Sequence, residues 1–480
     1  AQKDSRSVYI DGELIKDVTQ DPRLRGGAQT LAELYDLQHQ PDRIEEMTYI
    51  SPHNGQQAGL TFIEPRTQDE LTRRSRCMKH IADHTFGMFG RSPDYMNVIL
   101  AAMRAGADFF DEGSNGKGGA DHVRNYVDSC RDNDLTLTHV NVNPAVDRSK
   151  PVHQQEKDLA CKVVKETDAG FYVSGARMVA TLGPLADELL FMPSGSVRAA
   201  PEAADYALMF ALPTATDGLK IVCRPTLAPQ SPAHFLDHPL SSRFDETDSF
   251  IIFDNVFVPW ERAFIYRDPQ QYNSYYRYIL SHRHQLHQSL IRGVAKLEFL
   301  TGLACYLAKS TKVDGFPNVK NILARALVYT ETQRVLVGRL DETAVPSPWG
   351  TYMAQQKDLD TAQMLFHEQF AEVVDTVRTI GAGGIVAMPS YAELAGPAGE
   401  LVQQYYASAN LDSEARIRLF RLAADASISA LSGRQVLYER YYAGDPVRRN
   451  SGIYDRFPKD DLLGLVERAL DDMVKRGRNL

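Results

Sequence analysis

The spacing of apolar residues changes twice along this chain of 480 residues, and these two changes limit the folds that it can adopt. Up to about residue 136 the spacing is mainly helical, and Thr67 and Glu70 form a capping-box pattern ahead of an amphipathic run. Short β-rich runs punctuated by glycine and proline come next. After Pro259 the helical spacing returns in long segments. This order predicts an α+β fold with an N-terminal helical domain, a central β-barrel domain and a C-terminal four-helix bundle.

The expected boundaries follow from these changes. We expect domains at residues 1–136, 137–265 and 266–449, followed by a polar tail at 450–480 that docks on a neighbour. The expected strands are 137–142, 170–181, 189–192, 206–212, 219–223 and 250–258. The expected long helices are 276–311, 317–345, 352–380 and 411–443, with a last helix from 459 to about 475.

Charge and composition argue against several classes of protein. The formal net charge is -9 and the pI is about 5.8, whereas a nucleic-acid partner needs a basic surface. The sequence has no stretch of about 18 apolar residues, and its first residues are charged, so we expect a cytoplasmic protein with no membrane partner. Five widely spaced cysteines without a C-x-x-C pair indicate reduced, structural thiols.

The residues at the start of one early helix suit a phenolic oxygen. Pro93 fits the first helical position, Ser92 can cap the helix, and Asp94 complements the positive end of its dipole. Arg91 and the exposed N–H groups of the helix would both attract an anion. A free phenol has a pKa of roughly 10, so this site could hold a phenolate at neutral pH. Phenolate is the form whose ring carbon attacks electrophilic oxygen.

Each of the three side chains that would form this pocket also has a structural interpretation. Arg91 could pair with Asp94, and Tyr95 could be a half-buried core residue. His139 lies in an alternating run at 138–142, where a histidine is usually hydrogen-bonded and structural. As a base it would instead take the proton of the phenol. Both interpretations are open from these residues alone.

Motifs for nicotinamide, phosphate or metal binding are not evident in the sequence. The run at 381–384 lacks the G-x-G-x-x-G spacing, and the run at 116–118 is not followed by Ser or Thr. The histidines at 282, 284 and 287 do not share one face of a helix, which argues against a metal site. An oxidation in the pocket would therefore draw its electrons from a separate partner protein.

Eight short blocks, spread over nearly the whole chain, together resemble one family. They are VYIDGE (8–13), GRSPDY (90–95), TH (138–139), NPAVDR (143–148), DAG (168–170), VSGARMVAT (173–181), FDNVFVPWE (253–261) and YERYYAGDP (438–446). In this order they resemble the oxygenase component of the 4-hydroxyphenylacetate 3-hydroxylase family, two-component monooxygenases of phenols that use reduced flavin.

The resemblance implies a fold, a cofactor and a reaction. The fold would be acyl-CoA dehydrogenase-like and the assembly a homotetramer. FAD would bind as FADH2 between the β domain and the bundle, supplied by a separate NAD(P)H:flavin reductase. With O2 it would form a flavin C(4a)-hydroperoxide, which hydroxylates the ring carbon ortho to the oxygen of a small phenolic substrate.

The resemblance also implies roles for individual residues. The catalytic set would contact the phenolic oxygen and comprises Arg91, Tyr95 and His139. The substrate site would contain these three together with Ser194, Ser196 and His287. The cofactor site would contain His139, Asn143, Ala145, Val146, Asp147, Arg148, Thr181, Gln288, Arg292, Gly383, Gly384, Arg440, Ala443, Gly444, Asp445 and Pro446.

The identity of the phenol is left open by one departure from the family. The segment at 112–120, after the pocket helix, is longer and richer in glycine than the usual turn there. The substrate could be a hydroxyphenylacetate, a tyrosine-like amino acid, a halogenated phenol or a carrier-bound aryl group. The closest alternative activity is oxidative dehalogenation or denitration of substituted phenols by the same chemistry.

Two other enzymes of the same fold are weaker alternatives. An acyl-CoA dehydrogenase would have no use for the three phenol contacts. A 4-hydroxybutyryl-CoA dehydratase would carry an iron–sulfur cluster on three cysteines and one histidine, and the segment at 90–95 has no cysteine pair near it.

Overall fold

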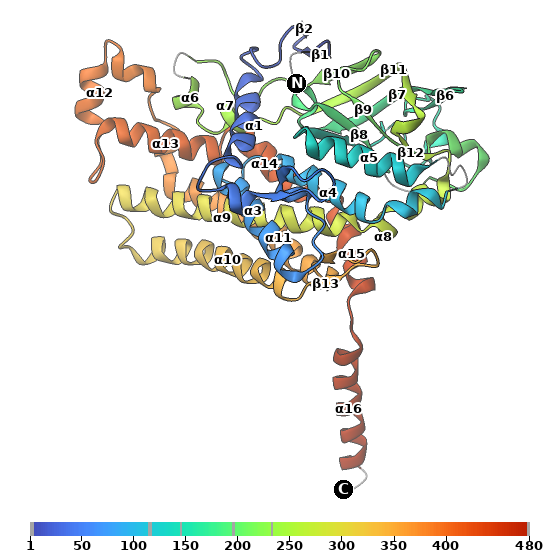
Figure 1. The fold of residues 1–480 in the computed structure, drawn as a ribbon. Helices are drawn as coiled ribbons and strands as arrows, with labels where there is room; N and C mark the ends of the chain where they lie inside the picture. Colours follow the sequence, from blue (N-terminus) through green and yellow to red (C-terminus); the bar gives the residue numbers. More distant parts are fainter. Residues whose placement is uncertain (1–3, 114–117, 145, 194–196, 232–233, 478–480) are drawn as a thin grey trace.

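Helices form the first part of the molecule, sheets the second and the longest helices the third (Figure 1). The computed structural model describes residues 4–113, 118–144, 146–193, 197–231 and 234–477. The sheets gather at one end, and the long helices run across the other side of the molecule. This is the predicted α+β order.

The first part of the chain is mainly helical but begins with two strands. Its elements are β1 (Ser7–Ile10), β2 (Glu13–Ile15), α1 (Arg25–Leu37), α2 (Ile44–Met47), β3 (Thr48–Ile50), β4 (Gln57–Gly59), η1 (Leu60–Phe62), α3 (Gln68–His84), α4 (Pro93–Ala105), η2 (Ala107–Asp111) and α5 (Gly119–Asp132). The predicted capping box is confirmed at α3, where Thr67 Oγ1 accepts from the Glu70 N–H at 3.2 Å and Glu70 Oε2 accepts from the Thr67 N–H at 3.2 Å.

The central part contains all six predicted strands. Its elements are β5 (Leu137–Val140), η3 (Val152–Gln154), β6 (Lys162–Thr167), β7 (Gly170–Ala180), η4 (Gly183–Leu185), β8 (Glu188–Phe191), η5 (Pro201–Tyr206), β9 (Leu208–Pro213), β10 (Leu219–Cys223), α6 (His234–Asp237), α7 (Ser241–Phe244), β11 (Ser249–Pro259), η6 (Trp260–Arg262) and β12 (Ala263–Tyr266). The sequence did not predict β6 and β12.

These strands form two sheets. One has the order β2-β1-β10-β11-β7-β6, and the other has the order β12-β9-β8-β5. β1 pairs in parallel with β10, so the first residues join a sheet that the sequence placed only after residue 136. No pairing among the described residues closes either sheet, so the structure shows two open sheets where a barrel was expected.

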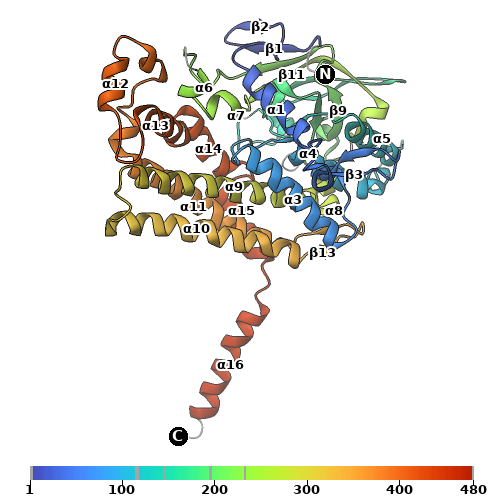
Figure 2. The same ribbon diagram turned by 60° about the vertical axis from the view of Figure 1, so that its left-hand side comes forward.

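The last part is built from long helices. Its elements are α8 (Pro269–Ile279), α9 (Ser281–Ser310), α10 (Pro317–Glu342), β13 (Val345–Pro346), β14 (Tyr352–Met353), α11 (Gln356–Gly381), η7 (Ala382–Ile385), η8 (Tyr391–Ala395), α12 (Gly399–Tyr405), α13 (Ser413–Ser427), α14 (Ala430–Tyr441), α15 (Pro446–Arg456) and α16 (Asp460–Gly477). Figures 1 and 2 show α9, α10 and α11 side by side, and α13 packs against α9 and α11 to complete the bundle. The predicted helix at 411–443 is divided because Ser429 caps a new helix, α14.

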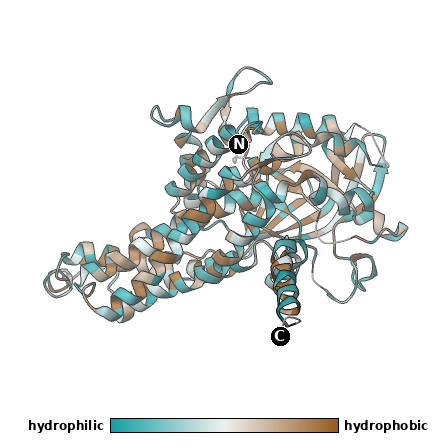
Figure 3. Cartoon of the chain, turned by 90° about the horizontal axis from the view of Figure 1, so that it is seen from below, coloured by the Kyte–Doolittle hydropathy of each residue, from teal (hydrophilic) through white to brown (hydrophobic). Residues whose placement is uncertain are grey.

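The last helix, α16, extends away from the rest of the molecule in both ribbon views (Figures 1 and 2). Seen from below in Figure 3, it carries hydrophobic as well as hydrophilic segments. Leu463, Val466 and Leu470 are spaced three and four residues apart, and all are exposed. None of the helices in the described ranges is long and apolar enough to cross a membrane.

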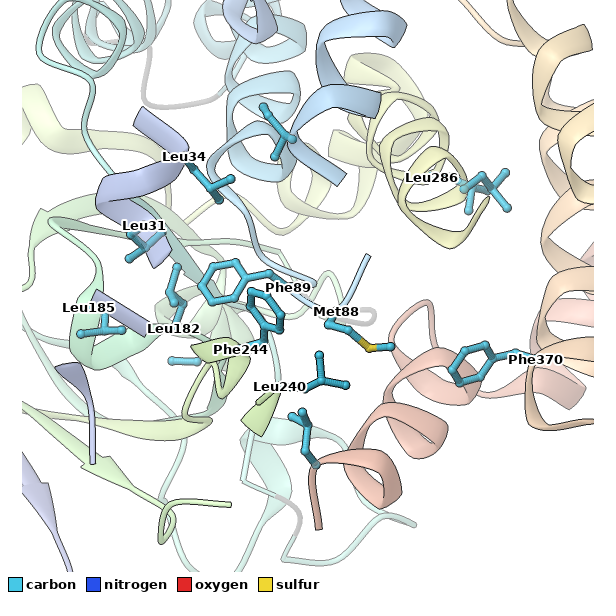
Figure 4. Close-up of a cluster of buried hydrophobic side chains, with 14 of the residues drawn as sticks. Leu31, Leu34, Met88, Phe89, Leu182, Leu185, Leu240, Phe244, Leu286 and Phe370 are labelled. Carbon is cyan, nitrogen blue, oxygen red and sulfur yellow. The ribbon is translucent and has the colours of Figure 1, made fainter. Parts of the chain in front are cut away.

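The loop that carries Arg91 is anchored in the hydrophobic core. Met88 and Phe89 are buried, and Figure 4 shows the Phe89 ring beside Phe244, with Leu31 of α1 nearby. Burying a phenylalanine side chain contributes about 1.5–3 kcal/mol. Phe244 is the last residue of α7 and leads into 245–248. One core cluster therefore fixes two loops, which supply the charged groups described below.

We predict that Gly26→Ala destabilises the protein. A Cβ at Gly26 would lie 1.8 Å from the carbonyl oxygen of Ser242, where α1 packs on α7. Overpacking of this kind costs about 1–3 kcal/mol. The free energy of unfolding should be measured by urea denaturation. The control is Gly302→Ala in α9, whose Cβ would have no atom within 4 Å and which should stabilise the helix by up to about 1 kcal/mol. Equal effects of the two substitutions would contradict this account.

Candidate active site

One cavity lies between the sheets and the helical bundle. Its volume is about 1030 Å³, and its walls come from α4, β5, β7, α8, α9, α11, α14 and α15 and the adjoining loops. This is at the upper end of the range for small-molecule sites. The three residues predicted to contact a phenolic oxygen, Arg91, Tyr95 and His139, all line it.

Arg91 lies in the wall with its guanidinium group only partly satisfied. The side chain is buried, with its central carbon 4.0 Å from the centroid of the Tyr95 ring. Nη1 donates to the hydroxyl of Tyr438, while Nε has no hydrogen-bond partner among the described residues. The backbone N–H of Arg91 donates to the carboxylate of Glu246. Arg91 therefore presents a positive charge to the cavity without a carboxylate bonded to its side chain.

The residues at the start of α4 have different partners from those expected. Ser92 precedes the helix, but its hydroxyl does not cap it. Asp94 does not pair with Arg91, because its Oδ2 accepts a hydrogen bond from Gln288 Nε2 at 2.9 Å. Burial raises the pKa of the Asp94 carboxyl. Gln288 thus holds Asp94 in the first turn of α4, and the Arg91 side chain is not paired with this carboxylate.

His139 and Tyr95 form a stacked pair in the wall. Their ring centroids are 5.7 Å apart at an interplanar angle of 28°, and the Tyr95 hydroxyl accepts from Gln285 Nε2 at 2.7 Å. All four residues of β5 are buried, unlike the predicted alternation, because α4 and β7 both pack on this strand. Burial, and then the charge of Arg91, lower the pKa of His139 to about 3. The imidazole is therefore neutral at physiological pH and can accept a hydrogen bond.

A network of carboxylates and arginines supports this wall. Arg434 donates to Glu246 Oε2 at 3.1 Å and to Asp248 Oδ1 at 2.7 Å. Asp248 also accepts from Arg224 at 3.0 Å and from the hydroxyl of Thr181 at 2.8 Å. Burial by itself would raise the pKa of Asp248, but the hydrogen bond and charge of Arg434 bring it below its usual value. Glu246 thereby connects this network to the Arg91 backbone.

A second ionic cluster lies on the bundle side and is fully buried. Glu439 accepts from Arg292 Nη1 at 2.6 Å and Nη2 at 3.0 Å, and from the ammonium group of Lys296. Lys296 also donates to Gln435 Oε1 at 2.6 Å. Burial would raise the pKa of Glu439, but the two cations lower it to about 2. Glu439 therefore supplies one negative charge to both Arg292 and Lys296, and burial lowers the pKa of Lys296 to about 7.

The structure brings together only some of the residues predicted for the site. Those that line the cavity are Arg91, Tyr95, His139, Thr181, Ala443 and Gly444. Those buried elsewhere are His287, Gln288 and Arg292. Those that are described but do not line it include Asn143, Val146, Asp147, Arg148, Gly383, Gly384, Arg440, Asp445 and Pro446. Those that lie outside the described residues are Ala145, Ser194 and Ser196.

Three of these residues have visible structural contacts. His287 Nε2 lies 3.4 Å from Asp341 Oδ1. A Cβ at Gly384 would lie 2.3 Å from the ring of Phe420, so close packing alone requires glycine there. Asp445 caps α15 by accepting from the Arg448 N–H at 2.9 Å. Their proposed contacts with substrate or cofactor stay predictions.

The sequence missed several cavity residues. Tyr438 lies within a block that carried the family resemblance, but its contact with Arg91 joins positions 347 residues apart. Asp248 and Arg434 meet across 186 residues. Gln285 was passed over in the histidine-rich run at 281–288. Pairs so distant in sequence leave no periodic signal.

The fold and the site together define an α+β enzyme whose active-site cavity, between the sheets and the helical bundle, presents a cation. Two family models match nearly the whole chain, the 4-hydroxyphenylacetate 3-hydroxylase N terminal at residues 2–265 and the 4-hydroxyphenylacetate 3-hydroxylase C terminal at residues 272–471. The chain belongs to the 4-hydroxyphenylacetate 3-hydroxylase family.

Individual relatives agree with this assignment. The chain is 38% identical, over 98% of its length and 95% of the relative's, to the 4-hydroxyphenylacetate 3-monooxygenase oxygenase component of Thermus thermophilus. A solved oxygenase component of this enzyme, complexed with FAD and 4-hydroxyphenylacetate, is 37% identical with a TM-score of 0.91, covering 99% of this chain and 97% of that one.

A 4-hydroxybutyryl-CoA dehydratase from N. maritimus shares the fold alone. It is 18% identical, with a TM-score of 0.85 over 97% of this chain and 92% of that one. In the part of the present chain that the structure describes, no group of three or more His, Cys, Asp or Glu side chains could hold a metal ion.

We predict that Glu439→Gln is strongly destabilising. The substitution keeps the shape of the side chain but leaves Arg292 and Lys296 buried without their counter-charge, at a cost of about 3–5 kcal/mol. Urea denaturation measures the loss. The control is Glu298→Gln, because Glu298 also pairs with one lysine and one arginine but at the surface, where such pairs contribute about 0–1 kcal/mol. Similar losses in the two variants would contradict the role assigned to Glu439.

We predict that His139 makes the protein less stable in acid. Its folded pKa of about 3 lies below the unfolded value of about 6.5, so the unfolded chain binds more protons between these pH values. The stability contributed by the neutral imidazole is complete above pH 6.5 and declines as the pH falls toward 3. His139→Asn should reduce the slope of unfolding free energy against pH by up to about 1.4 kcal/mol per pH unit in this window. Unchanged slopes would mean that His139 is not held neutral.

Proposed function

We propose that this chain is the oxygenase component of a two-component, reduced-flavin-dependent monooxygenase that hydroxylates a phenol ortho to its hydroxyl group. The observation that carries the proposal is the meeting of three buried side chains, Arg91, Tyr95 and His139, in the wall of one cavity. In the net reaction one atom of O2 enters the ring and the other leaves as water, while FADH2 gives up two electrons and becomes FAD. A separate NAD(P)H:flavin reductase supplies FADH2.

The three side chains would act on the phenolic oxygen in different ways. The positive charge of Arg91 favours the phenolate over the phenol, because an adjacent cation lowers the pKa of an acid. His139 is neutral, so it can accept the hydrogen bond of the phenol. Tyr95 holds the position of both, since its ring contacts the guanidinium of Arg91 and stacks on the imidazole of His139. The phenolate form makes the ortho carbon electron-rich.

The cavity residues fit FAD in two respects. The volume is large, and Arg449 lines it with Nε and Nη1 buried and without partners among the described residues, as a group awaiting a phosphate or carbonyl oxygen would be. Gly444, at φ +99°, leaves its surroundings open, because a Cβ added there would have no atom within 4 Å. When bound, reduced FAD supplies the activated oxygen. The remaining predicted cofactor residues are proposals on the strength of family resemblance.

We also propose a homotetramer, in which α16 docks on another copy of the chain. Leu463, Val466, Leu470 and Val474 are each more than half exposed on this helix. Covering apolar surface stabilises by about 25 cal/mol per Å², so a helix of this kind favours a partner. The division into domains at 136, 265 and 449 is likewise part of the proposal.

We predict that His139→Ala lowers hydroxylation while FAD binding is retained. Loss of the hydrogen-bond acceptor for the phenol should lower the rate about tenfold, because one such hydrogen bond contributes about 0.5–1.5 kcal/mol. Oxygen consumption should then yield hydrogen peroxide instead of catechol. The measurement is product formed per NADH oxidised with an added reductase, and FAD affinity is followed by fluorescence. The control is His53→Ala, a half-exposed histidine that pairs with Asp128 outside the cavity.

Two outcomes would contradict parts of this proposal. If His139→Ala forms as much product per NADH oxidised as the wild-type enzyme, the role of His139 is structural. Formation of peroxide alone from wild-type enzyme, with a panel of hydroxyphenylacetate, tyrosine and halogenated phenols, would end the proposed activity. The same panel decides between hydroxylation and loss of halide.

A further inference from the structure

Tyr438 places a phenol of the protein's own at the guanidinium group expected to receive the substrate phenol. Its hydroxyl accepts from Arg91 Nη1, and it is the one hydrogen-bond partner of the Arg91 side chain in the described ranges. The same hydroxyl donates to the carbonyl oxygen of Gly90 at 3.4 Å. Tyr438 also lines the cavity. A substrate phenol that bonds to Arg91 Nη1 must therefore displace this contact.

The packing around Tyr438 holds its ring in this place. The ring stacks on Tyr442, with centroids 5.3 Å apart at 14°. A Cβ at Gly90 would lie 2.8 Å from both Cζ and the hydroxyl oxygen of Tyr438, so the close approach depends on glycine there. Arg292 and Arg434 lie 5.3 and 5.4 Å from the ring centroid. Cations around an aromatic ring are attracted to its faces.

The hydroxyl of Tyr438 is a weaker partner for Arg91 than a phenolate would be. Burial raises the pKa of Tyr438 although Arg91 and Arg292 oppose this, so the group is neutral at physiological pH. The bond from Arg91 to Tyr438 is assisted by one charge only, that of the guanidinium, whereas a bond from Arg91 to a phenolate would join two opposite charges. A phenol that ionises on binding can thus replace the Tyr438 hydroxyl at Arg91. The displaced hydroxyl can still donate to the carbonyl oxygen of Gly90. A ligand with an uncharged group at this position gains little by displacing Tyr438.

We propose that Tyr438 is a specificity-determining resident phenol, which occupies the hydrogen-bonding position of Arg91 until a substrate phenolate displaces it. This rests on the proposed function, in which Arg91 receives the phenolic oxygen. The Tyr438 hydroxyl gives the buried guanidinium of Arg91 a hydrogen-bond partner when substrate is absent. Because a ligand must displace this hydroxyl, binding of ligands without an acidic hydroxyl is disfavoured.

The test is ligand affinity in Tyr438→Phe, which keeps the ring but removes the competing hydroxyl. The full chain is loaded with reduced FAD without oxygen and titrated with 4-hydroxyphenylacetate or with phenylacetate, which has no phenol. We expect the Kd for 4-hydroxyphenylacetate to fall about tenfold or more, the value of one hydrogen bond to a charged group, and that for phenylacetate to stay the same. In turnover KM should fall with kcat unchanged.

The matched control is Tyr329→Phe, because Tyr329 also accepts from an arginine, Arg325 Nη2 at 3.4 Å, but on α10 outside the cavity. It should leave both Kd values unchanged. Equal or weaker phenol binding by folded Tyr438→Phe would overturn the proposal, since the hydroxyl would then serve to orient Arg91.

A second measurement covers the case in which Tyr438→Phe does not fold. In the wild-type enzyme the affinity for ring-substituted 4-hydroxyphenylacetates should rise as their phenols become more acidic. An affinity that does not change with the acidity of the phenol would overturn the proposed displacement of Tyr438. If the wild-type enzyme binds 4-hydroxyphenylacetate no better than phenylacetate, the proposed function fails and this inference fails with it.

Discussion

The site depends on keeping one buried guanidinium charged and incompletely neutralised beside a cavity. A buried charge is costly unless it is paired, and proteins usually pair it directly with a carboxylate. Here Glu246 bonds the backbone N–H of Arg91 and not its side chain. The neighbouring cations differ from Arg91, since the side chains of Arg292 and Lys296 both pair directly with the carboxylate of Glu439. Arg91 thereby keeps its charge for a ligand, and the networks around it prevent the repulsion of several unpaired cations.

The backbone that carries Arg91 is positioned by close packing. Gly87 has φ +67°, and a Cβ there would lie 2.6 Å from the Arg292 carbonyl oxygen, so the chain runs against α9 at this point. Phe89 enters the hydrophobic core two residues later, and Gly90 admits Tyr438. A guanidinium group placed by such packing needs little reorganisation when an anion arrives, which is the condition for effective electrostatic stabilisation.

Local features of this fold could be predicted from the sequence, and distant pairings could not. The α3 capping box and the six central strands could be predicted because each depends on residues close together in the sequence. The pairing of β1 with β10 joins segments about 210 residues apart, and nothing in the local pattern of 7–10 indicates it. Likewise, Arg91, Tyr95 and His139 could be selected as candidates, but their support by Glu246, Gln285 and Tyr438 arises only when the helices and sheets meet. A local pattern can also mislead, because Ser92 is suited to capping but its side chain does not cap α4.

The shared fold does not by itself decide the chemistry. A 4-hydroxybutyryl-CoA dehydratase has the same architecture at 18% identity, so the architecture supplies a cavity between sheets and bundle and little more. What distinguishes the present chain is the content of the cavity wall. A cation without its own carboxylate, a neutral imidazole and a tyrosine ring that contacts both suit an oxygen that carries negative charge. That requirement is met by a phenol during ortho attack, since its charge moves from oxygen to the ring carbon that reacts. In the proposed function the wall would therefore stabilise the phenolate form of the substrate, and this would be a property of a few side chains and not of the fold.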